Sequence, residues 1–425
     1  MAIKGFFASV AFAAFFASVA FPQDAPQVRT GIKEIFGESR AAQAKLGLVN
    51  NPSANEEERA LSDIVRMDLE LIGLVEITEL EAKDVSNFNY PRLEIKAVKS
   101  KKGYAAHVNL AAGQETLASK NFNAPDQTKT RRIGHKIAEM TLKSLTGEKG
   151  FFTSRIAFTL RSQKNKNIKE LWVADWDGKN AAAVTQWSTV SMLPAFSPDG
   201  REIAFTSYRE GNPDLYIHDL VTNATRLFSG LQGLNASASF DPLGQGVAVT
   251  LSRGQDPNLY LISREGKILN RLTSTMGVDT AATFSPNGQE IAFTTDRSGN
   301  PQIFIMSKSG GNIRRLTYGF FWADGADWSV DGSAIAFAGK KSREEKFQIF
   351  IADPLGLKFV QITTEGANEH PAFSADSRFL AYSSNKNGKW EIFIKGITVE
   401  TPEIKVLGFE RADCLEPAWS VSEKE

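Results

Sequence analysis

A repeat of about 44 residues constrains the fold of this chain more than any other feature. An aromatic residue followed by a turn sequence recurs along the chain with spacings of 44, 44, 44 and 45 residues, and the five copies begin at Phe196, Phe240, Phe284, Trp328 and Phe373. A fixed period of roughly 40 to 50 residues is typical of propellers and solenoids, in which each repeat is one supersecondary unit. The repeat therefore predicts either a closed ring or an open stack of similar units.

Each repeat contains four short β-prone runs separated by turn sequences. Pro198-Asp199-Gly200 and Pro286-Asn287-Gly288 suit tight turns, because proline presets φ and glycine takes a positive φ without a Cβ clash. The second run of each unit is short and apolar, which suits a sheet stacked between two neighbours. It occurs six times, beginning at Ile156, Ile203, Val247, Ile291, Ile335 and Leu380. We therefore predict a mainly β chain with a six-bladed propeller.

The last strand-like run of the chain indicates that the ring is closed. The first unit lacks its own turn strand, and an orphan copy, Pro417-Ala418-Trp419-Ser420, follows the sixth unit. We expect this C-terminal strand to complete the first blade, so that no sheet edge is left open at the seam. An open solenoid would instead need polar caps at both ends.

The first twenty residues have the pattern of a signal peptide. Lys4 supplies a positive charge, residues 6–19 form an apolar run, and Ser18-Val19-Ala20 places small residues at a cleavage site. We expect the mature chain to begin at Phe21 in the periplasm, with no membrane span after cleavage, since the apolar run is short for one. An uncleaved anchor is the alternative interpretation.

Residues 21–148 lack the repeat and predict a small α/β domain that precedes the propeller at residues 149–425. One helix is expected from Asn55, followed by three glutamates that suit a helix N-terminus, to Gly73, and a second from about Asp126 to Leu145. Strand-like runs lie between these helices, at residues 75–77, 93–95 and 104–110. Residues 21–32 are expected to form a mobile N-terminal segment.

Charge and cysteine content exclude two classes of interaction. The chain has 49 Lys and Arg residues against 49 Asp and Glu residues, which gives no electrostatic case for nucleic acid as a partner. Cys414 is the single cysteine, so no intramolecular disulfide can form. We expect a buried structural thiol, because no cationic residue is adjacent to it in the sequence.

The junction between the two predicted domains resembles a known family. Residues 143–150 (KSLTGEKG) run into residues 152–158 (FTSRIAF), which is similar to the helix end and first propeller strand of the TolB family, the soluble periplasmic component of the Tol-Pal system. Arg132 with residues 135–139, and residues 64–69, resemble the helices of that family. The resemblance covers nearly the whole exported chain, and the junction is its most specific part because similar turns occur in other propellers.

This resemblance implies binding rather than chemistry, without a cofactor. In the family the propeller mouth receives the lipoprotein Pal, and the N-terminal segment engages TolA, in support of outer-membrane integrity and of envelope constriction at cell division. Other outer-membrane proteins are further candidate partners, and we expect a monomer. The matching positions for Pal lie in the loops that lead into the innermost strands: Asn235, Ser237, Asp279, Thr280, Asp324, Glu369, His370 and Glu416. Those for TolA are Val28, Arg29, Thr30, Gly31 and Ile32.

The sequence departs from the family pattern at three places. Ser237 and Ala281 replace polar residues of the third and fourth blades, which puts individual contacts in question. Residues 46–49 (LGLV) are a weak substitute for a hydrophobic strand of the first domain, and residues 21–27 precede the segment that matches the TolA-binding strand.

Sequence motifs for a metal are incomplete. Residues 175–178 (DWDG) resemble half of a calcium loop but lack the later acidic ligand, so we interpret them as a hairpin turn. The four histidines, at positions 107, 135, 218 and 370, show no paired spacing for zinc. His135 and His218 are expected to be packing or solvated residues, whereas His370 at the mouth suits either recognition or an ordinary loop. No metal site is predicted.

A propeller enzyme is the rival hypothesis. A hydrolase domain would need a Gly-x-Ser-x-Gly elbow, and the sequence contains none. A metal-dependent lactonase or hydrolase would need ligands that converge in the central channel, and Asp279, Asp324, Glu369 and Glu416 are the candidates. Metal analysis of the purified protein would separate this alternative from a binding protein, and we predict no catalytic residues.

Overall fold

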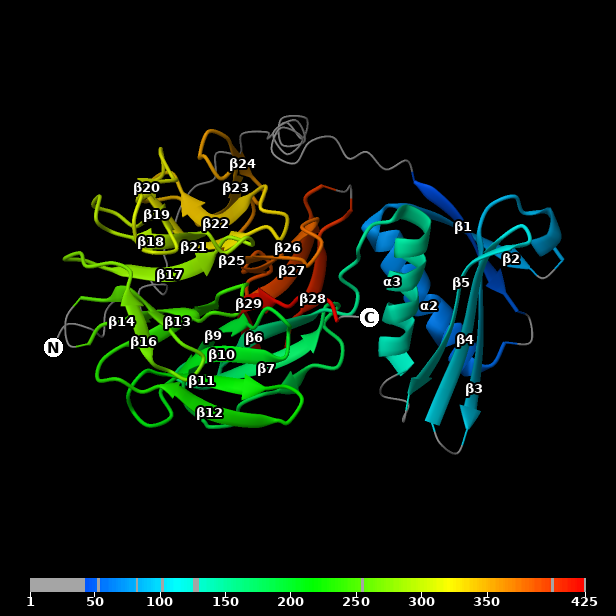
Figure 1. The fold of residues 1–425 in the computed structure, drawn as a ribbon, viewed down its shortest axis with the longest axis horizontal. Coiled ribbons are helices and arrows are strands. Elements are labelled where there is room, and N and C mark those ends of the chain that lie inside the picture. The colour runs from blue at the N-terminus through cyan, green and yellow to red at the C-terminus, as the bar shows by residue number, and fades with distance from the viewer. Residues whose placement is uncertain are drawn as a thin grey trace.

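A computed structural model describes residues 43–51, 54–81, 83–100, 103–124, 130–253, 256–398 and 401–423. The predicted signal peptide, the predicted N-terminal segment at 21–32 and the start of the second predicted helix at Asp126 lie outside these ranges. The described chain forms an N-terminal part with one five-stranded sheet and a second part with six four-stranded sheets arranged as a six-bladed propeller (Figure 1). Both parts match the predicted fold class.

The N-terminal part is a sheet covered on one face by two helices. Its strand order is β2-β1-β3-β4-β5, with β1 parallel to both of its neighbours. Residues 46–49, which the sequence suggested were a weak substitute for a hydrophobic strand, lie within strand β1. The bounds are β1 (Ala44–Asn50), α2 (Glu56–Ile72), β2 (Val75–Glu81), the 3-10 helix η2 (Val85–Asn87), β3 (Arg92–Ser100), β4 (Gly103–Ala112), β5 (Glu115–Ala124) and α3 (Thr130–Thr146).

Local sequence signals set both ends of α2. The side chain of Asn55 accepts a hydrogen bond of 2.9 Å from the backbone N–H of Glu58, and three glutamates occupy the first turn. This pairing satisfies a free N–H group and places negative charge at the positive end of the helix dipole. Gly73 ends the helix in the left-handed conformation with a φ of 68°, as the sequence predicts.

The propeller consists of six blades, and the first is closed by the end of the chain. β29 pairs antiparallel with β6, with Trp419 opposite Ile156, and the N–H of Ser420 donates to the carbonyl of Arg155 at 2.9 Å. The predicted closure is confirmed. Blade 1 contains β29 (Ala412–Trp419), β6 (Arg155–Ser162), β7 (Lys169–Asp175) and β8 (Ala182–Ala183); blade 2 contains β9 (Ser191–Phe196), β10 (Glu202–Ser207), β11 (Asp214–Asp219) and β12 (Ala224–Ser229).

The other four blades keep the same order from the innermost to the outermost strand, and their second strands are packed between neighbouring blades. Ile291, Ala292 and Phe293 in blade 4 are fully buried, as expected for a sheet covered on both faces. The bounds are β13 (Asn235–Phe240), β14 (Val247–Leu251), β15 (Asn258–Ile262) and β16 (Ile268–Arg271) in blade 3; β17 (Asp279–Phe284), β18 (Glu290–Thr295), β19 (Gln302–Ser307) and β20 (Arg314–Arg315) in blade 4; β21 (Trp322–Trp328), β22 (Ile335–Lys340), β23 (Gln348–Ala352) and β24 (Phe359–Gln361) in blade 5; and β25 (Asn368–Phe373), β26 (Phe379–Ser384), β27 (Glu391–Gly396) and β28 (Ile404–Leu407) in blade 6.

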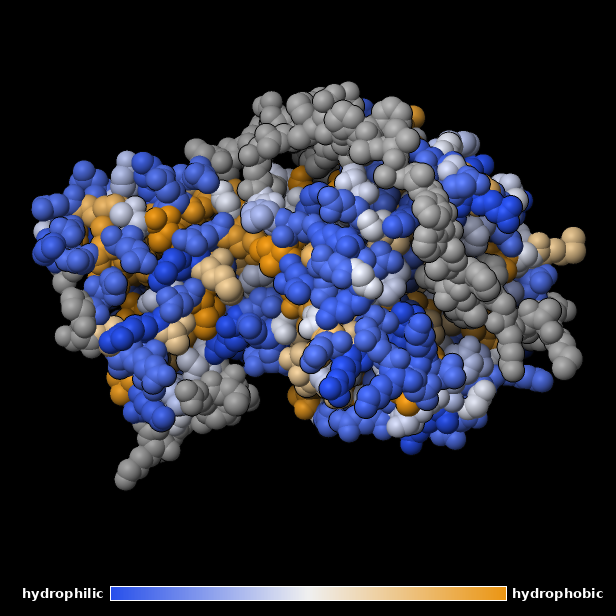
Figure 2. All heavy atoms as spheres, turned by 180° about the vertical axis from the view of Figure 1, so that it is seen from behind, coloured by the Kyte–Doolittle hydropathy of each residue, from blue (hydrophilic) through white to orange (hydrophobic). Residues whose placement is uncertain are grey.

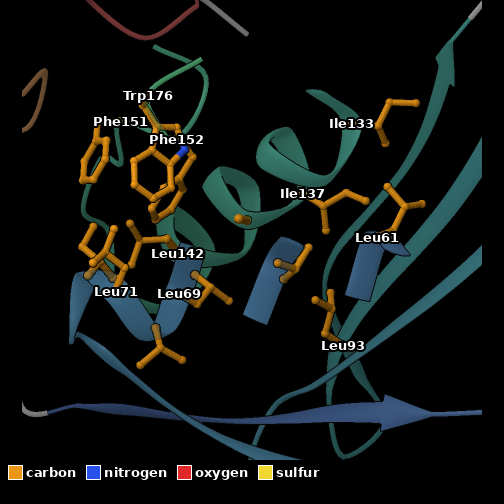
Figure 3. Packing of buried hydrophobic residues seen from close by; sticks show 14 of the residues in the cluster. Leu61, Leu69, Leu71, Leu93, Ile133, Ile137, Leu142, Phe151, Phe152 and Trp176 are labelled. Atoms are coloured by element: carbon orange, nitrogen blue, oxygen red, sulfur yellow. The ribbon is translucent and has the colours of Figure 1, made fainter. Parts of the chain in front are cut away.

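Aromatic side chains join the two parts. The helices lie between the N-terminal sheet and the propeller (Figure 1). Phe151 packs against Trp176 and Trp419 with ring centroids 5.2 Å apart in each case, and against Phe379 at 5.0 Å. Figure 3 shows Phe151, Phe152 and Trp176 lying together beside Leu142 of α3. Because these rings belong to one continuous hydrophobic core with both helices, the two parts share buried apolar surface, which stabilises their contact.

The face of the molecule shown in Figure 2 is mostly polar. Seen from behind, hydrophilic residues cover most of the visible face, with hydrophobic residues in small groups between them (Figure 2). Among the described residues, neither helix combines the length and the apolar character needed to cross a membrane. Cys414 is fully buried in β29, as predicted for a structural thiol, and burial raises the pKa of its thiol to about 12.

Candidate functional site

The N-terminal part contacts blades 6 and 1 at one end of the propeller. Arg378, in the turn after inner strand β25, pairs with Glu148 at 2.6 Å, and Arg131 of α3 pairs with Asp177 in the turn after β7, a strand that runs in the same direction as the inner strand of its blade. The inner strands of the six blades therefore begin at the opposite end. We call that end the mouth and define it by the first residues of β9, β13, β17, β21, β25 and β29.

Every inner strand has a bulge at the same point near the mouth. The pairing register shifts there in all six blades, and one residue of each bulge adopts a left-handed conformation. These residues are Leu193, Ser237, Ala281, Gly325, His370 and Glu416, with φ between 50° and 64°. Five of them are not glycine, which is uncommon at positive φ, and strained backbone of this kind clusters at binding sites. A bulge re-aims the side chain that it carries.

The structure corrects the predicted location of the mouth residues. The sequence interpretation placed all eight in loops that lead into the inner strands, whereas they lie within strands β13, β17, β21, β25 and β29. The reason is that each inner strand continues past its bulge for two or more residues, still paired with its neighbour, and the turn sequence alone did not reveal this extension. Ser237, His370 and Glu416 are the bulge residues themselves.

Asn235 and Asp279 are completely buried and hold the preceding loops in place. The carboxamide of Asn235 accepts from the Ser229 hydroxyl at 2.7 Å and donates to the Leu231 carbonyl at 2.6 Å. Asp279 accepts from Thr275 Oγ1 at 2.6 Å and from the Arg297 guanidinium at 3.0 Å. Because their polar atoms are used internally, the two residues shape the rim and do not present a surface.

Three carboxylates and a histidine come together at the mouth. Burial raises the pKa of Glu369, His370 opposes this effect, and the negative charges of Asp324 and Glu416 add to it. Asp324 is half-buried and accepts a hydrogen bond of 2.7 Å from Thr294 Oγ1. The Nδ1 atom of His370 is buried and has no hydrogen-bond partner. We call Asp324, Glu369, His370 and Glu416 the mouth cluster.

Glu416 is the best-supported member of the mouth cluster. Burial raises the pKa of this carboxyl, but the charges of Lys169 and His370 and the hydrogen bonds from Leu193 and Thr159 together outweigh burial, so its pKa is lowered overall. Its oxygens lie 3.6 Å from Lys169 Nζ and accept from Thr159 Oγ1 at 2.8 Å and from the Leu193 N–H at 3.0 Å. Hydrogen bonds to the charged form favour ionisation, so blade 1 places a fixed negative charge next to blade 2.

Thr280 and Ser237 complete the predicted set on the other side of the mouth. Both side chains are half-buried. The hydroxyl of Thr280 lies 3.2 Å from that of Thr250. Apart from the buried Asn235 and Asp279, the predicted residues therefore form two groups, a charged one in blades 5, 6 and 1 and a neutral one in blades 3 and 4.

Sequence reasoning missed two basic residues near the charged group. Lys169 pairs with Glu416, and Arg161 pairs with Asp413 at 2.7 Å. The repeat did contain a signal for Lys169, because its position is filled by Pro213, Pro257 and Pro301 in the next three blades. The charged residue in place of a repeated proline distinguishes blade 1 from blades 2 to 4 at the mouth.

The four carboxylates suggested for a metal-dependent enzyme do not assemble as one ligand set. Asp279 is occupied by Arg297. Within the described ranges, the one group of histidine and carboxylate atoms close enough to hold a metal is not at the mouth; it comprises His135, Asp175 and Asp177.

Comparisons with known proteins support the fold. The family model for the TolB beta propeller domain matches residues 142–423. A Tol-Pal system protein TolB from Cereibacter sphaeroides is 43% identical over 97 residues, which are 23% of this chain and 22% of that protein. One from Polaromonas sp. is 28% identical over 232 residues, which are 49% of this chain and 53% of that protein. The chain thus matches between about a fifth and about half of the length of these curated relatives.

A solved structure extends the similarity over both parts. The crystal structure of TolB from Acinetobacter baumannii has a TM-score of 0.76 and 25% sequence identity, and the match covers 90% of this chain and 97% of that one. The arrangement of a small α/β part and a six-bladed propeller is therefore shared with a solved protein.

Proposed function

This chain belongs to the TolB β-propeller family, and from that premise we propose that it is a periplasmic component of a Tol-Pal system that binds the lipoprotein Pal at its propeller mouth. The single observation that carries this proposal is the mouth cluster. Its carboxylates and its unpartnered His370 Nδ1 gather at the end of the propeller opposite the described contacts of the N-terminal part.

The geometry supports docking of a folded partner. The mouth side chains are carried by paired strands, so binding does not have to order a flexible loop, which keeps the entropic cost of association low. Asp324 and Glu369 would accept hydrogen bonds from N–H donors of Pal, and a donor or acceptor on Pal would satisfy His370 Nδ1. Asn235 and Asp279 would act indirectly, by fixing the loops between blades.

A second partner is proposed for the N-terminal segment. Val28, Arg29, Thr30, Gly31 and Ile32 match the segment that engages TolA in the family, and an extended segment can add to a partner's sheet through main-chain hydrogen bonds. We propose that Pal binding and TolA binding are coupled, and that the coupled system supports outer-membrane integrity and envelope constriction. Export by a cleaved signal peptide, a periplasmic location and a monomeric state belong to the same proposal.

Binding rather than catalysis is the role that we propose for the mouth. Asp279 is neutralised by Arg297, and Glu416 is engaged by Lys169 and Thr159. Carboxylates held in this way have few lone pairs left for a catalytic metal. The geometry therefore favours recognition over hydrolysis.

Calorimetric titration of the mature chain with purified Pal tests the Pal proposal. Asp324→Asn keeps the size of the side chain but removes one charge, and we expect it to weaken binding by about tenfold, a typical value for a close charged contact. Asp353→Asn is the matched control, because Asp353 lies in a turn at the other end of blade 5; its affinity should equal that of the wild type. Wild-type affinity in Asp324→Asn and Glu369→Gln would remove the mouth cluster from the interface.

Deletion of residues 21–32 tests the TolA proposal. The shortened chain should retain its affinity for Pal within a small factor and lose binding to TolA in the same assay. Binding of TolA that survives the deletion would contradict the role proposed for this segment.

A further inference from the structure

A cluster of ionisable side chains, of which His135 is buried and the two aspartates are partly buried, lies where the N-terminal part meets the propeller. His135 is on α3, and Asp175 and Asp177 flank Trp176 at the turn that follows β7. One ring nitrogen of His135 and one carboxylate oxygen of each aspartate lie within 4.8 Å of one another. The cluster is at the opposite end of the channel from the mouth, so the proposed binding of Pal does not use it.

The hydrogen bonding of His135 leaves one ring nitrogen without a role. Its Nδ1 lies 2.6 Å from a carboxylate oxygen of Asp68, which is itself fully buried. The other nitrogen, Nε2, is buried and has no hydrogen-bond partner, on a side chain that is 2% exposed. In the tautomer in which the Nδ1–H group donates to Asp68, Nε2 carries a lone pair. A buried lone pair beside two carboxylates is stabilised by a hydrogen-bond donor or a cation placed against it.

The arrangement Asp68–His135 is the outer shell usually found behind a metal ligand. Histidines that bind metals commonly donate their second ring N–H to a carboxylate, which fixes the tautomer and makes the ligating nitrogen more basic. We propose that His135, Asp175 and Asp177 bind a divalent metal ion. A set of one imidazole and two carboxylates, with one position left for water, suits Zn²⁺ in tetrahedral coordination.

Each aspartate has one oxygen that is not engaged by a neighbouring amide, although that of Asp177 is paired with Arg131. Asp175 accepts from Asn180 Nδ2 at 2.7 Å through Oδ2, which leaves Oδ1, and Asp177 accepts from the N–H of Lys179 at 3.1 Å through Oδ1, which leaves Oδ2. The turn itself is the hairpin that the sequence predicts, with the N–H of Gly178 donating to the Asp175 carbonyl at 2.9 Å. The hairpin thus holds both carboxylates on the side of α3.

The guanidinium of Arg131 would compete with the metal ion for Asp177. It contacts the Oδ2 atom of Asp177, and its Nε is buried without a hydrogen-bond partner. Without a metal, this cation neutralises the carboxylate. Binding of a metal ion requires the guanidinium to swing aside, and the side chain is 23% exposed, so it has a route to water. Arg131 therefore lowers the affinity for the metal and sets the concentration at which the site fills.

A metal ion at this position would tie the two parts of the molecule together. One ligand comes from α3 and two come from the hairpin after β7, so the ion would connect elements that otherwise touch through aromatic rings and the Arg131–Asp177 pair. Because the ion binds only when both parts are folded and in contact, it would stabilise that arrangement by mass action. The bound ion would limit relative motion of the two parts.

The test is titration of Zn²⁺ into the metal-free mature chain in competition with a chromophoric chelator. The wild type should bind one equivalent of Zn²⁺, and its melting temperature should rise in the same titration. Asp177→Asn keeps the shape of the turn and should weaken binding by at least about tenfold, since it removes an anionic ligand. Asp353→Asn, in a corresponding hairpin turn of blade 5 where no histidine is near, should bind as the wild type does.

Arg131→Met separates a metal site from a structural ion pair. If the cluster binds metal, removing the competing cation should tighten Zn²⁺ binding by several-fold. If the cluster is only an ion-pair network, this variant should gain no affinity. Co²⁺ provides a second readout, because its visible absorption in the wild type should be lost in Asp175→Asn, which is checked for native circular dichroism. Equal Zn²⁺ binding by wild type, Asp177→Asn and Asp353→Asn would overturn the proposal.

Discussion

At the end of the propeller that faces α3, aromatic rings and ion pairs close the surface, whereas at the mouth the inner strands carry charges with few partners. Trp176 and Phe151 pack at right angles at the closed end, with an interplanar angle of 88°. At the mouth, burial and the negative charge of Asp324 raise the pKa of the Glu369 carboxyl, and the buried Nδ1 of His370 has no hydrogen-bond partner. The closed end also uses Phe151 and α3, which lie before the first blade, whereas the mouth residues lie within the inner strands of the blades.

This contrast indicates that the two ends of the propeller have different roles. The closed end buries apolar surface, which stabilises the fold and fixes the N-terminal part against the ring. The mouth keeps like charges close together, which costs stability unless a partner neutralises them. Proteins retain such unfavourable arrangements mainly where they serve a function.

Removal of β29 should have the largest effect, because this strand runs through both ends. Deletion of residues 412–425 removes Trp419 from the aromatic cluster and Glu416 from the mouth, and leaves the edge of β6 unpaired. We expect a loss of more than about 5 kcal/mol, which is comparable to the whole stability of many domains. Thermal melting of the intact and shortened chains measures it, and identical melting curves would contradict the closed ring.

Two tryptophan substitutions should separate stability from binding. Trp176→Ala at the closed end removes a side chain that is 2% exposed, and should cost about 3 to 5 kcal/mol by creating a cavity. Affinity for Pal should be unchanged in the folded fraction. Trp322→Ala at the mouth removes a half-buried ring. It should cost less stability than Trp176→Ala and should weaken the binding of Pal. Urea unfolding and calorimetry on both variants measure these effects, and a reversed pattern would contradict the different roles of the two ends.

Asp327 should make stability depend on pH. This carboxyl lies in β21, where burial raises its pKa to about 7 although the N–H groups of Phe373 and Trp328 donate to it. The folded protein therefore holds the proton up to about pH 7, while the unfolded chain loses it near pH 4. This group's contribution to the free energy of unfolding thus falls between about pH 4 and 7 as pH rises.

Asp327→Asn removes this titration and keeps an acceptor for the N–H of Phe373, which donates at 2.7 Å. The variant should be close to the wild type in stability near pH 4 and become more stable than it as pH rises to about 7, with the full difference present at pH 8. Urea unfolding across this range provides the measurement. Parallel pH profiles for the two proteins would show that Asp327 titrates normally.

The smallest effect is expected at Cys414. Burial in β29 and a pKa raised to about 12 keep the thiol protonated, so it should not react with a disulfide reagent at pH 8 in the folded protein. The unfolded chain should react within minutes. Rapid labelling of the folded protein would show that β29 opens readily and that the seam of the ring is weak.

The blade number, the ring closure and the ends of α2 could be predicted because they depend on local turn chemistry and on a period that recurs. Pro198-Asp199-Gly200 favours a tight turn through its own local geometry, and Asn55 caps a helix with its own side chain. The predicted mouth positions also lie in the inner strands of the blades that the repeat assigned.

The left-handed bulges could not be predicted, because Leu193 and Ala281 carry no preference for positive φ. The burial of Asn235 and Asp279 depends on loops whose paths are set by tertiary contacts. His135 meets Asp175 and Asp177 only through the packing of α3 on blade 1, so sequence spacing gave no indication of a shared site.

The central claim is that the two ends of the propeller have different tasks, and hydrogen–deuterium exchange of the mature chain with and without Pal tests it most directly. We predict slower exchange on binding at residues 273–280, 317–324 and 363–370, which lead into β17, β21 and β25 at the mouth. The turns at 175–179 and 374–378, which the N-terminal part covers, should exchange at the same rate in both samples. Protection confined to those two turns, with none at the mouth, would contradict the account.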